Sequence, residues 1–184
     1  FLKTLQTLPE AAELVSRVEN GGCPAVLTGT QPVQRACIGA AVADGAKRPM
    51  VFLCADEREA QQLAGDLKSL TGTEPVTFFA REWQFRPNAV SSREWERSRL
   101  AALHRMAQGA APVVVATVDA LLARTMPRPR LAALSVTLEP GGRADLNRLT
   151  AQLMQAGYTR CDQVEGVGQF ALRGGILDVF SPLM

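Results

Sequence analysis

The chain has 184 residues, of which 47% are hydrophobic, enough for one full domain and part of a second. Its 20 basic and 18 acidic side chains give a net charge of +2, which argues against a dedicated nucleic-acid-binding domain, because such domains carry an obvious basic excess. No apolar run approaches the roughly 20 residues that a membrane-spanning helix needs, and the first residues do not have the pattern of a signal peptide. We therefore expect a cytoplasmic protein.

The first two thirds of the chain alternate predicted helices with short apolar segments. An amphipathic helix with Pro9 in its first turn is predicted to end at the Gly21-Gly22 pair. Buried strands are predicted at residues 25–28, 50–55, 76–79 and 113–117. Further helices are predicted at about residues 33–43, after Asp56, at 92–108 and at 120–124. This alternation is typical of an α/β fold with a mainly parallel sheet and helices on both faces.

The alternation of helices and apolar strands stops at the segment "MPRPR", residues 126–130. We interpret this segment as a domain boundary. Beyond it, the sequence predicts a strand at "LSVTL", residues 134–138, and a helix at residues 145–157. The run "QFALRGGILDVF", residues 169–180, predicts two strands about Gly174-Gly175, forming a hairpin or a bulge. The second part therefore looks like the beginning of a small α+β domain.

The four cysteines are scattered, with no Cys-x-x-Cys pair, which favours reduced thiols over a disulfide framework. The single histidine, His104, cannot complete a usual zinc set, so no metal site is expected. No Ser/His/Asp or Cys/His catalytic set can be argued either. Since the chain begins with Phe1 instead of Met, we expect a piece of a longer protein.

The segment "LTGTQPV", residues 27–33, begins like a phosphate-binding loop between a strand and a helix, but it lacks the chemistry. Pro32 and Val33 stand where such a loop needs a lysine and a hydroxyl, and proline has no N–H to offer a phosphate. The predicted strand at residues 113–117 is followed by one carboxylate, Asp119, rather than an acidic pair that would hold magnesium. We therefore predict no bound nucleotide, and the fold of a nucleotide-driven motor domain whose site has been lost.

Three stretches carry a resemblance to a known family. They are residues 78–103, 113–127 and 153–180, the last of which contains "GQFALRGGILDVF". In this order and spacing they resemble the amino-terminal part of bacterial transcription-repair coupling factor (Mfd), a region itself similar to the excision-repair protein UvrB. The run from Gly168 to Phe180 is the most specific part of the resemblance.

The resemblance implies a RecA-like first domain, degenerate for ATP, at residues 1–128, and the first part of a UvrA-binding domain at residues 129–184. It also implies that the full-length protein is a DNA translocase ATPase, although this part of it is not an enzyme. Contacts with RNA polymerase and DNA would belong to regions outside this chain. UvrB has an intact phosphate-binding loop and a long aromatic hairpin after its third strand, for which residues 85–92 leave no room.

Arg173, in "FALRGG", is the residue for which the family implies contact with UvrA. A guanidinium on a strand beside glycines can reach a carboxylate with two N–H bonds, whereas the plain interpretation is a solvated strand arginine. Phe170, on the other strand face, is more typical of a core residue than of a contact. Strand alternation then requires Arg173 to point outward if Phe170 and Leu172 are buried.

Two other groups of residues could bind a partner, but a structural role is the more usual interpretation of each. Trp83, Phe85 and Trp95 could stack on bases, but tryptophans beside a helix more often pack a loop onto a sheet. Arg124, Arg128 and Arg130 could touch DNA or a partner, but an exposed basic linker is the commoner arrangement.

The function that the sequence and the resemblance favour is a non-catalytic adaptor module that recruits UvrA to stalled RNA polymerase for nucleotide excision repair. The alternative is an ATP-dependent, UvrB-like or helicase-like domain that binds damaged DNA.

Overall fold

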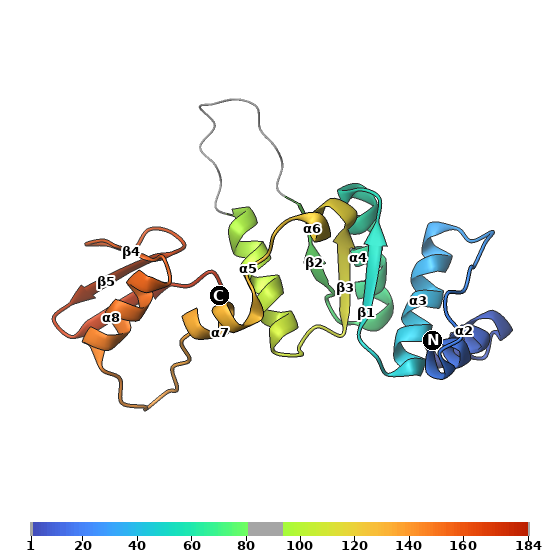
Figure 1. Ribbon diagram of the computed structural model, residues 1–184, viewed down its shortest axis with the longest axis horizontal. Coiled ribbons are helices and arrows are strands. Elements are labelled where there is room, and N and C mark those ends of the chain that lie inside the picture. Colours follow the sequence, from blue (N-terminus) through green and yellow to red (C-terminus); the bar gives the residue numbers. More distant parts are fainter. Residues whose placement is uncertain (1, 81–93, 184) are drawn as a thin grey trace, which may run out of the picture. The chain divides into compact units, whose positions relative to one another are not determined.

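The computed structural model describes residues 2–80 and 94–183 and divides into two compact units. The first unit consists of Phe1–Glu82 and Gln108–Ala123, and the second of Trp83–Ala107 and Arg124–Met184. Figure 1 shows the elements of each unit.

The first unit is an α/β fold built on a three-stranded parallel sheet. Its strands are β1 (Met50–Cys54), β2 (Val76–Phe78) and β3 (Val113–Thr117), in the order β1-β3-β2. Its helices are α1 (Leu2–Gln6), α2 (Pro9–Asn20), α3 (Pro32–Ala46), α4 (Glu57–Thr71) and α6 (Val118–Leu122). The α/β class and the parallel pairing of the three later predicted strands are confirmed.

The core of this unit lies between the sheet and helices α3 and α4. Small side chains line the helices and let them approach the strands closely, as Figure 1 shows for α4 beside the sheet. The buried cluster consists of Ala36, Ala40, Cys54, Ala60, Leu67 and Val115.

The strand predicted at residues 25–28 is wrong: this segment forms no strand, and β1 pairs with β3 alone. Val26 and Leu27 are exposed instead of buried, at 87% and 38%. Three consecutive apolar residues are too short a signal to separate a buried strand from a connecting segment, and Pro24 just before them has no N–H for a ladder.

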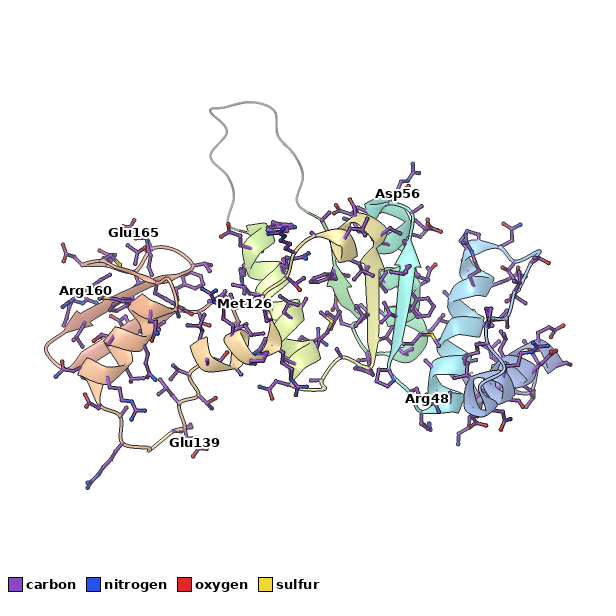
Figure 2. The ribbon with its side chains drawn as sticks, viewed as in Figure 1. Arg48, Asp56, Met126, Glu139, Arg160 and Glu165 are labelled. Atoms are coloured by element: carbon purple, nitrogen blue, oxygen red, sulfur yellow. The ribbon has the colours of Figure 1, made fainter. Side chains whose placement is uncertain are left out.

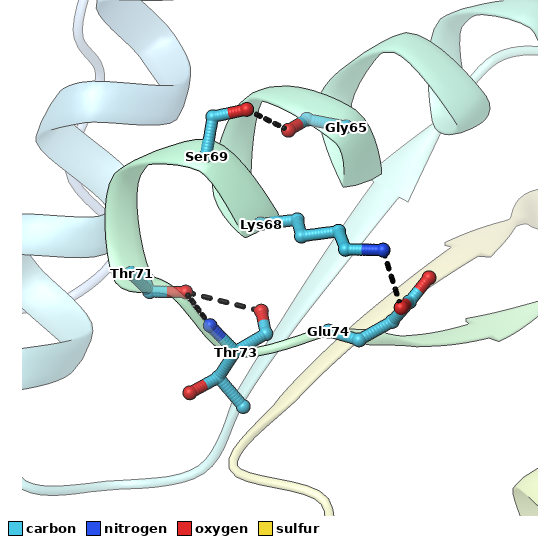
Figure 3. A network of polar contacts seen from close by, with 6 residues as sticks. All are labelled: Gly65, Lys68, Ser69, Thr71, Thr73 and Glu74. Atoms are coloured by element: carbon cyan, nitrogen blue, oxygen red, sulfur yellow. Dashed lines mark hydrogen bonds and ion pairs between the residues drawn. The ribbon is translucent and has the colours of Figure 1, made fainter.

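Helix α4, which connects β1 to β2, is delimited by a cap at each end. Its first turn is capped by Asp56, whose Oδ1 accepts a hydrogen bond from the backbone N–H of Glu59 over 2.8 Å. It ends at Gly72, whose φ of 69° lies in the left-handed region that glycine adopts most readily. Past that cap, Lys68 Nζ reaches Glu74 Oε2 over 2.7 Å, so the chain is held where it turns into β2 (Figure 3).

The second unit contains a small mixed sheet in the order β4-β5-β6. Strands β4 (Thr159–Arg160) and β5 (Gln169–Arg173) are parallel, and β5 and β6 (Ile176–Phe180) are antiparallel. Its helices are α5 (Glu94–Ala107), α7 (Arg128–Leu134) and α8 (Leu146–Gln155). The predicted hairpin is thus confirmed, and α8 begins after the cap of Asp145, which accepts from two backbone N–H groups.

The strand predicted at residues 134–138 is also wrong. Leu134 is the last residue of α7, and residues 135–139 form no strand. The backbone N–H of Ser135 donates to Ala132 O over 3.2 Å, and its hydroxyl donates to Leu131 O over 2.7 Å. These bonds close the helix, and Val136 and Leu138 lie exposed beyond it.

Candidate docking surface

The β5–β6 hairpin places Arg173 at the end of a strand. Gly174 and Gly175 form the two-residue turn, with φ values of 53° and 90°. Positive φ at both positions is what a type I′ turn requires, and glycine adopts it at no steric cost. Because the turn has two residues, the register is fixed, and Ala171 lies opposite Asp178.

Burial falls along β5 toward the hairpin turn, on both faces of the strand. Phe170 is 0% exposed, as expected for a core side chain, and Ala171 on the opposite face is also 0% exposed. The Arg173 side chain retains 64% of its accessible surface. Arg173 therefore points into solvent at the open end of the face that Ala171 occupies.

Arg173 has an ionic partner that the sequence reasoning did not identify. Its Nη2 donates to Asp178 Oδ2 over 2.8 Å, and the Asp178 side chain is itself 43% exposed. Asp178 lies opposite Ala171, so the pair spans the two strands diagonally on one face. The signal was present in the sequence, since a two-residue Gly174-Gly175 turn sets this register.

The connection between β4 and β5 is braced by a side chain from β5. Gln169 Oε1 accepts hydrogen bonds from the backbone N–H groups of Glu165 and Gly166, each over 2.9 Å. Arg160, on β4, pairs in register with Phe170. Figure 2 labels Arg160 and Glu165, which come from this strand and from the connection after it.

The segment that begins like a phosphate-binding loop, residues 27–33, leads into α3. Pro32 opens α3 without an N–H, and the N–H of Gln31 donates to Gln34 Oε1 over 2.8 Å. Arg35, the nearest cation, pairs with Glu59 over 3.2 Å. The Gln31 N–H and the Arg35 guanidinium are thus both engaged within the protein.

A cavity of about 400 Å³ lies beside this segment, at the end of β1 and between α3 and α4. Its lining includes both members of the Arg35–Glu59 pair and the thiol of Cys54. Burial raises the pKa of the Cys54 thiol, with the charge of Glu59 acting in the same direction. Burial and the raised pKa both disfavour a reactive thiolate at Cys54.

The other candidate residues lie on α5, on and around α7, or outside the described residues. The ring of Trp95 has the guanidinium of Arg99 over it, 5.4 Å from the ring centroid, while Trp83 and Phe85 fall outside the described residues. The predicted absence of a long hairpin at residues 85–92 also falls outside them. Arg124, Arg128 and Arg130 are exposed.

Within residues 2–80 and 94–183, no group of three or more His, Cys, Asp or Glu side chains could hold a metal ion. The helices in the same two ranges are all too short or too polar to cross a membrane.

Comparison with known proteins finds a family match within the second unit. The UvrB interaction domain family matches residues 136–184, which contain α8 and the whole β4-β5-β6 sheet. The Arg173 hairpin therefore lies inside the matched region. The fold and this match define an α/β module that ends in a UvrB interaction domain.

Relatives extend the similarity to nearly the whole chain. It is 27% identical over 168 residues to the transcription-repair-coupling factor of Bacillus subtilis, covering 91% of this chain and 14% of that protein. With the transcription-repair-coupling factor of Mycobacterium tuberculosis it shares 33% identity over 184 residues, covering 95% of this chain and 14% of the relative. It is also 26% identical over 182 residues to UvrABC system protein B of Renibacterium salmoninarum, covering 91% of this chain and 26% of that protein.

The chain belongs to the family of transcription-repair-coupling factors and corresponds to their UvrB-like region. It spans about 14% of the length of the first of these relatives.

Proposed function

We propose that this chain is a non-catalytic adaptor module that binds UvrA and brings the excision machinery to stalled RNA polymerase. In this proposal it acts in the cytoplasm, in transcription-coupled nucleotide excision repair. RNA polymerase and DNA are engaged by parts of the longer protein outside these residues.

The observation that carries the proposal is the position of Arg173. It lies within residues 136–184, the part that matches the UvrB interaction domain family, and its side chain is 64% exposed beside the two-residue turn of the β5–β6 hairpin. A planar guanidinium can make a bidentate contact with a carboxylate, which fixes orientation as well as adding affinity. The partner surface is therefore expected to present a carboxylate to this arginine.

The first unit serves as a scaffold in this proposal, with a RecA-like fold and a degenerate nucleotide site. The engaged Gln31 N–H, the proline at position 32 and the Arg35–Glu59 pair support the lack of nucleotide binding. The domain limits proposed are residues 1–128 and residues 129–184.

The similarity to UvrABC system protein B favours one alternative, an ATP-dependent damage-binding domain. Calorimetry with Mg-ATP separates the two functions. The adaptor gives no binding heat, whereas a micromolar dissociation constant, about −8 kcal/mol, would support the alternative.

The proposal is tested by calorimetric titration of the chain with UvrA. Arg173→Ala is compared with Arg143→Ala, a control that removes an exposed arginine from a loop of the same unit. The adaptor account expects binding by the native chain and the control, and weaker binding by Arg173→Ala.

A further inference from the structure

The connection between β4 and β5, residues 161–168, is held at its centre by one side chain. Gln169 Oε1 accepts from Glu165 N and Gly166 N, each over 2.9 Å, and the Cys161 sulfur lies 4.0 Å from the same oxygen. The backbone N–H of Gln169 also donates a hydrogen bond to Gly166 O, over 3.3 Å. One side-chain oxygen therefore holds two backbone N–H groups at the centre of the loop.

The two ends of the loop are fixed differently. Gly168 N donates to Phe180 O over 2.9 Å, and Gly168 O accepts from Thr159 N over 2.8 Å. At the other end, Cys161 N donates to Phe170 O over 2.9 Å. These backbone bonds, like the bond from Gln169 N to Gly166 O, do not involve the Gln169 side chain. That side chain acts on the loop centre through the N–H groups of Glu165 and Gly166.

The loop centre lies on the face of β5 that carries Arg173. Side chains alternate along a strand, so Gln169, Ala171 and Arg173 point to the same side. Four residues at about 3.3 Å each put Gln169 roughly 13 Å from Arg173 along the strand. A typical interface buries about 800 Å² on each partner, roughly 28 Å across, and a patch of that size centred on Arg173 reaches the Gln169 end of the strand.

From this geometry we infer that Gln169 is a positioning residue of the docking surface, which holds loop 161–168 in the shape that the partner of Arg173 meets. The inference rests on the proposed function, since the partner is taken to be UvrA. Gln169 contributes to docking indirectly. Its hydrogen bonds hold the backbone of Glu165 and Gly166 in place before the partner binds. A pre-ordered loop strengthens binding because less conformational entropy is lost on association.

The test separates the acceptor oxygen of Gln169 from its bulk. Gln169→Met keeps the length of the side chain and removes the acceptor oxygen. Gln169→Asn keeps the amide but shortens the side chain by one methylene. Gln169→Glu retains an oxygen that accepts from N–H groups. Gln155→Met, at the exposed end of α8, makes the same chemical change away from the loop. UvrA affinity is measured by calorimetry, and amide hydrogen exchange of residues 165 and 166 by NMR.

The inference predicts about tenfold weaker UvrA binding for Gln169→Met and Gln169→Asn, with faster exchange at Glu165 and Gly166. Gln169→Glu restores both affinity and protection, and Gln155→Met matches the native chain. A role confined to the fold would instead leave the UvrA affinity of the folded variants at the native value.

Native affinity in Gln169→Met or Gln169→Asn, with faster exchange at residues 165 and 166, would overturn the inference while leaving UvrA binding intact. A Gln169→Glu variant as weak as Gln169→Met would overturn it too. If the native chain does not bind UvrA at all, the proposed function fails first, and the inference falls with it.

Discussion

Arg173 and Asp178 form a diagonal ion pair across the β5–β6 hairpin, with Nη2 and Oδ2 separated by 2.8 Å. Both side chains are largely in solvent, so the pair contributes about 0–1 kcal/mol to stability. Arg173 is therefore oriented without being sequestered, and its remaining N–H groups stay available to a partner carboxylate.

Replacing Asp178 tests whether this pair matters to docking. We expect Asp178→Asn to change UvrA affinity by less than about fivefold, because an exposed pair contributes less than about 1 kcal/mol. Calorimetry of the single variants and of the double variant with Arg173→Ala measures the coupling. A loss in Asp178→Asn as large as that in Arg173→Ala would mean that Asp178 contacts the partner itself.

Phe170 is expected to anchor the second unit. It is 0% exposed, and Phe→Ala at such sites costs about 3–5 kcal/mol, since a large cavity is left. Urea denaturation of Phe170→Ala measures this cost, and Phe180→Ala, at a position 37% exposed, should cost much less. Equal losses would contradict the burial described for β5.

The four cysteines should differ in reactivity. Cys23 is exposed, whereas Cys54 is buried and burial raises its thiol pKa, so less thiolate is present at neutral pH. Titration with a thiol-specific reagent under native conditions should modify Cys23 first and Cys54 last. Rapid modification of Cys54 in folded protein would show that the α3–α4 core opens.

Asp44 should make a small part of the stability dependent on acid pH. Hydrogen bonds from Lys47 and then Gln6 lower the Asp44 pKa below its ordinary value of 3.8. Stability from the charged form is therefore present above pH 3.8 and is lost as the pH falls through the lower folded value. Asp44→Asn should reduce the melting temperature at pH 7, with the difference narrowing below pH 3.8; a constant difference would contradict this linkage.

Local signals predicted most of the helices because their ends are set by nearby residues. Asp56 and Gly72 delimit α4, and Gly21, with φ of 75°, ends α2 as the glycine pair indicated. Gly174-Gly175 similarly predicted two strands that meet at a hairpin or a bulge, and strand alternation predicted the outward position of Arg173.

Strand pairing was less predictable, because a strand exists only if another edge accepts its backbone bonds. Residues 25–28 and 134–138 have apolar character but no such partner, and the short β4 was missed since two residues show no periodicity. The Gln169 brace was also missed, because it depends on how loop 161–168 folds back.

The measurement that tests the account most directly is the affinity of the Arg173→Ala variant for UvrA, determined by calorimetry. The thermal unfolding of the same variant is measured beside it. Truncating one side of a partly desolvated charged contact costs about 2–5 kcal/mol, roughly 30- to 4000-fold in affinity. We predict a loss in this range with a nearly unchanged melting temperature, and only partial recovery in Arg173→Lys, because an ammonium lacks the bidentate geometry. Native affinity in Arg173→Ala would contradict the central claim, and a large drop in melting temperature would make Arg173 a structural residue instead.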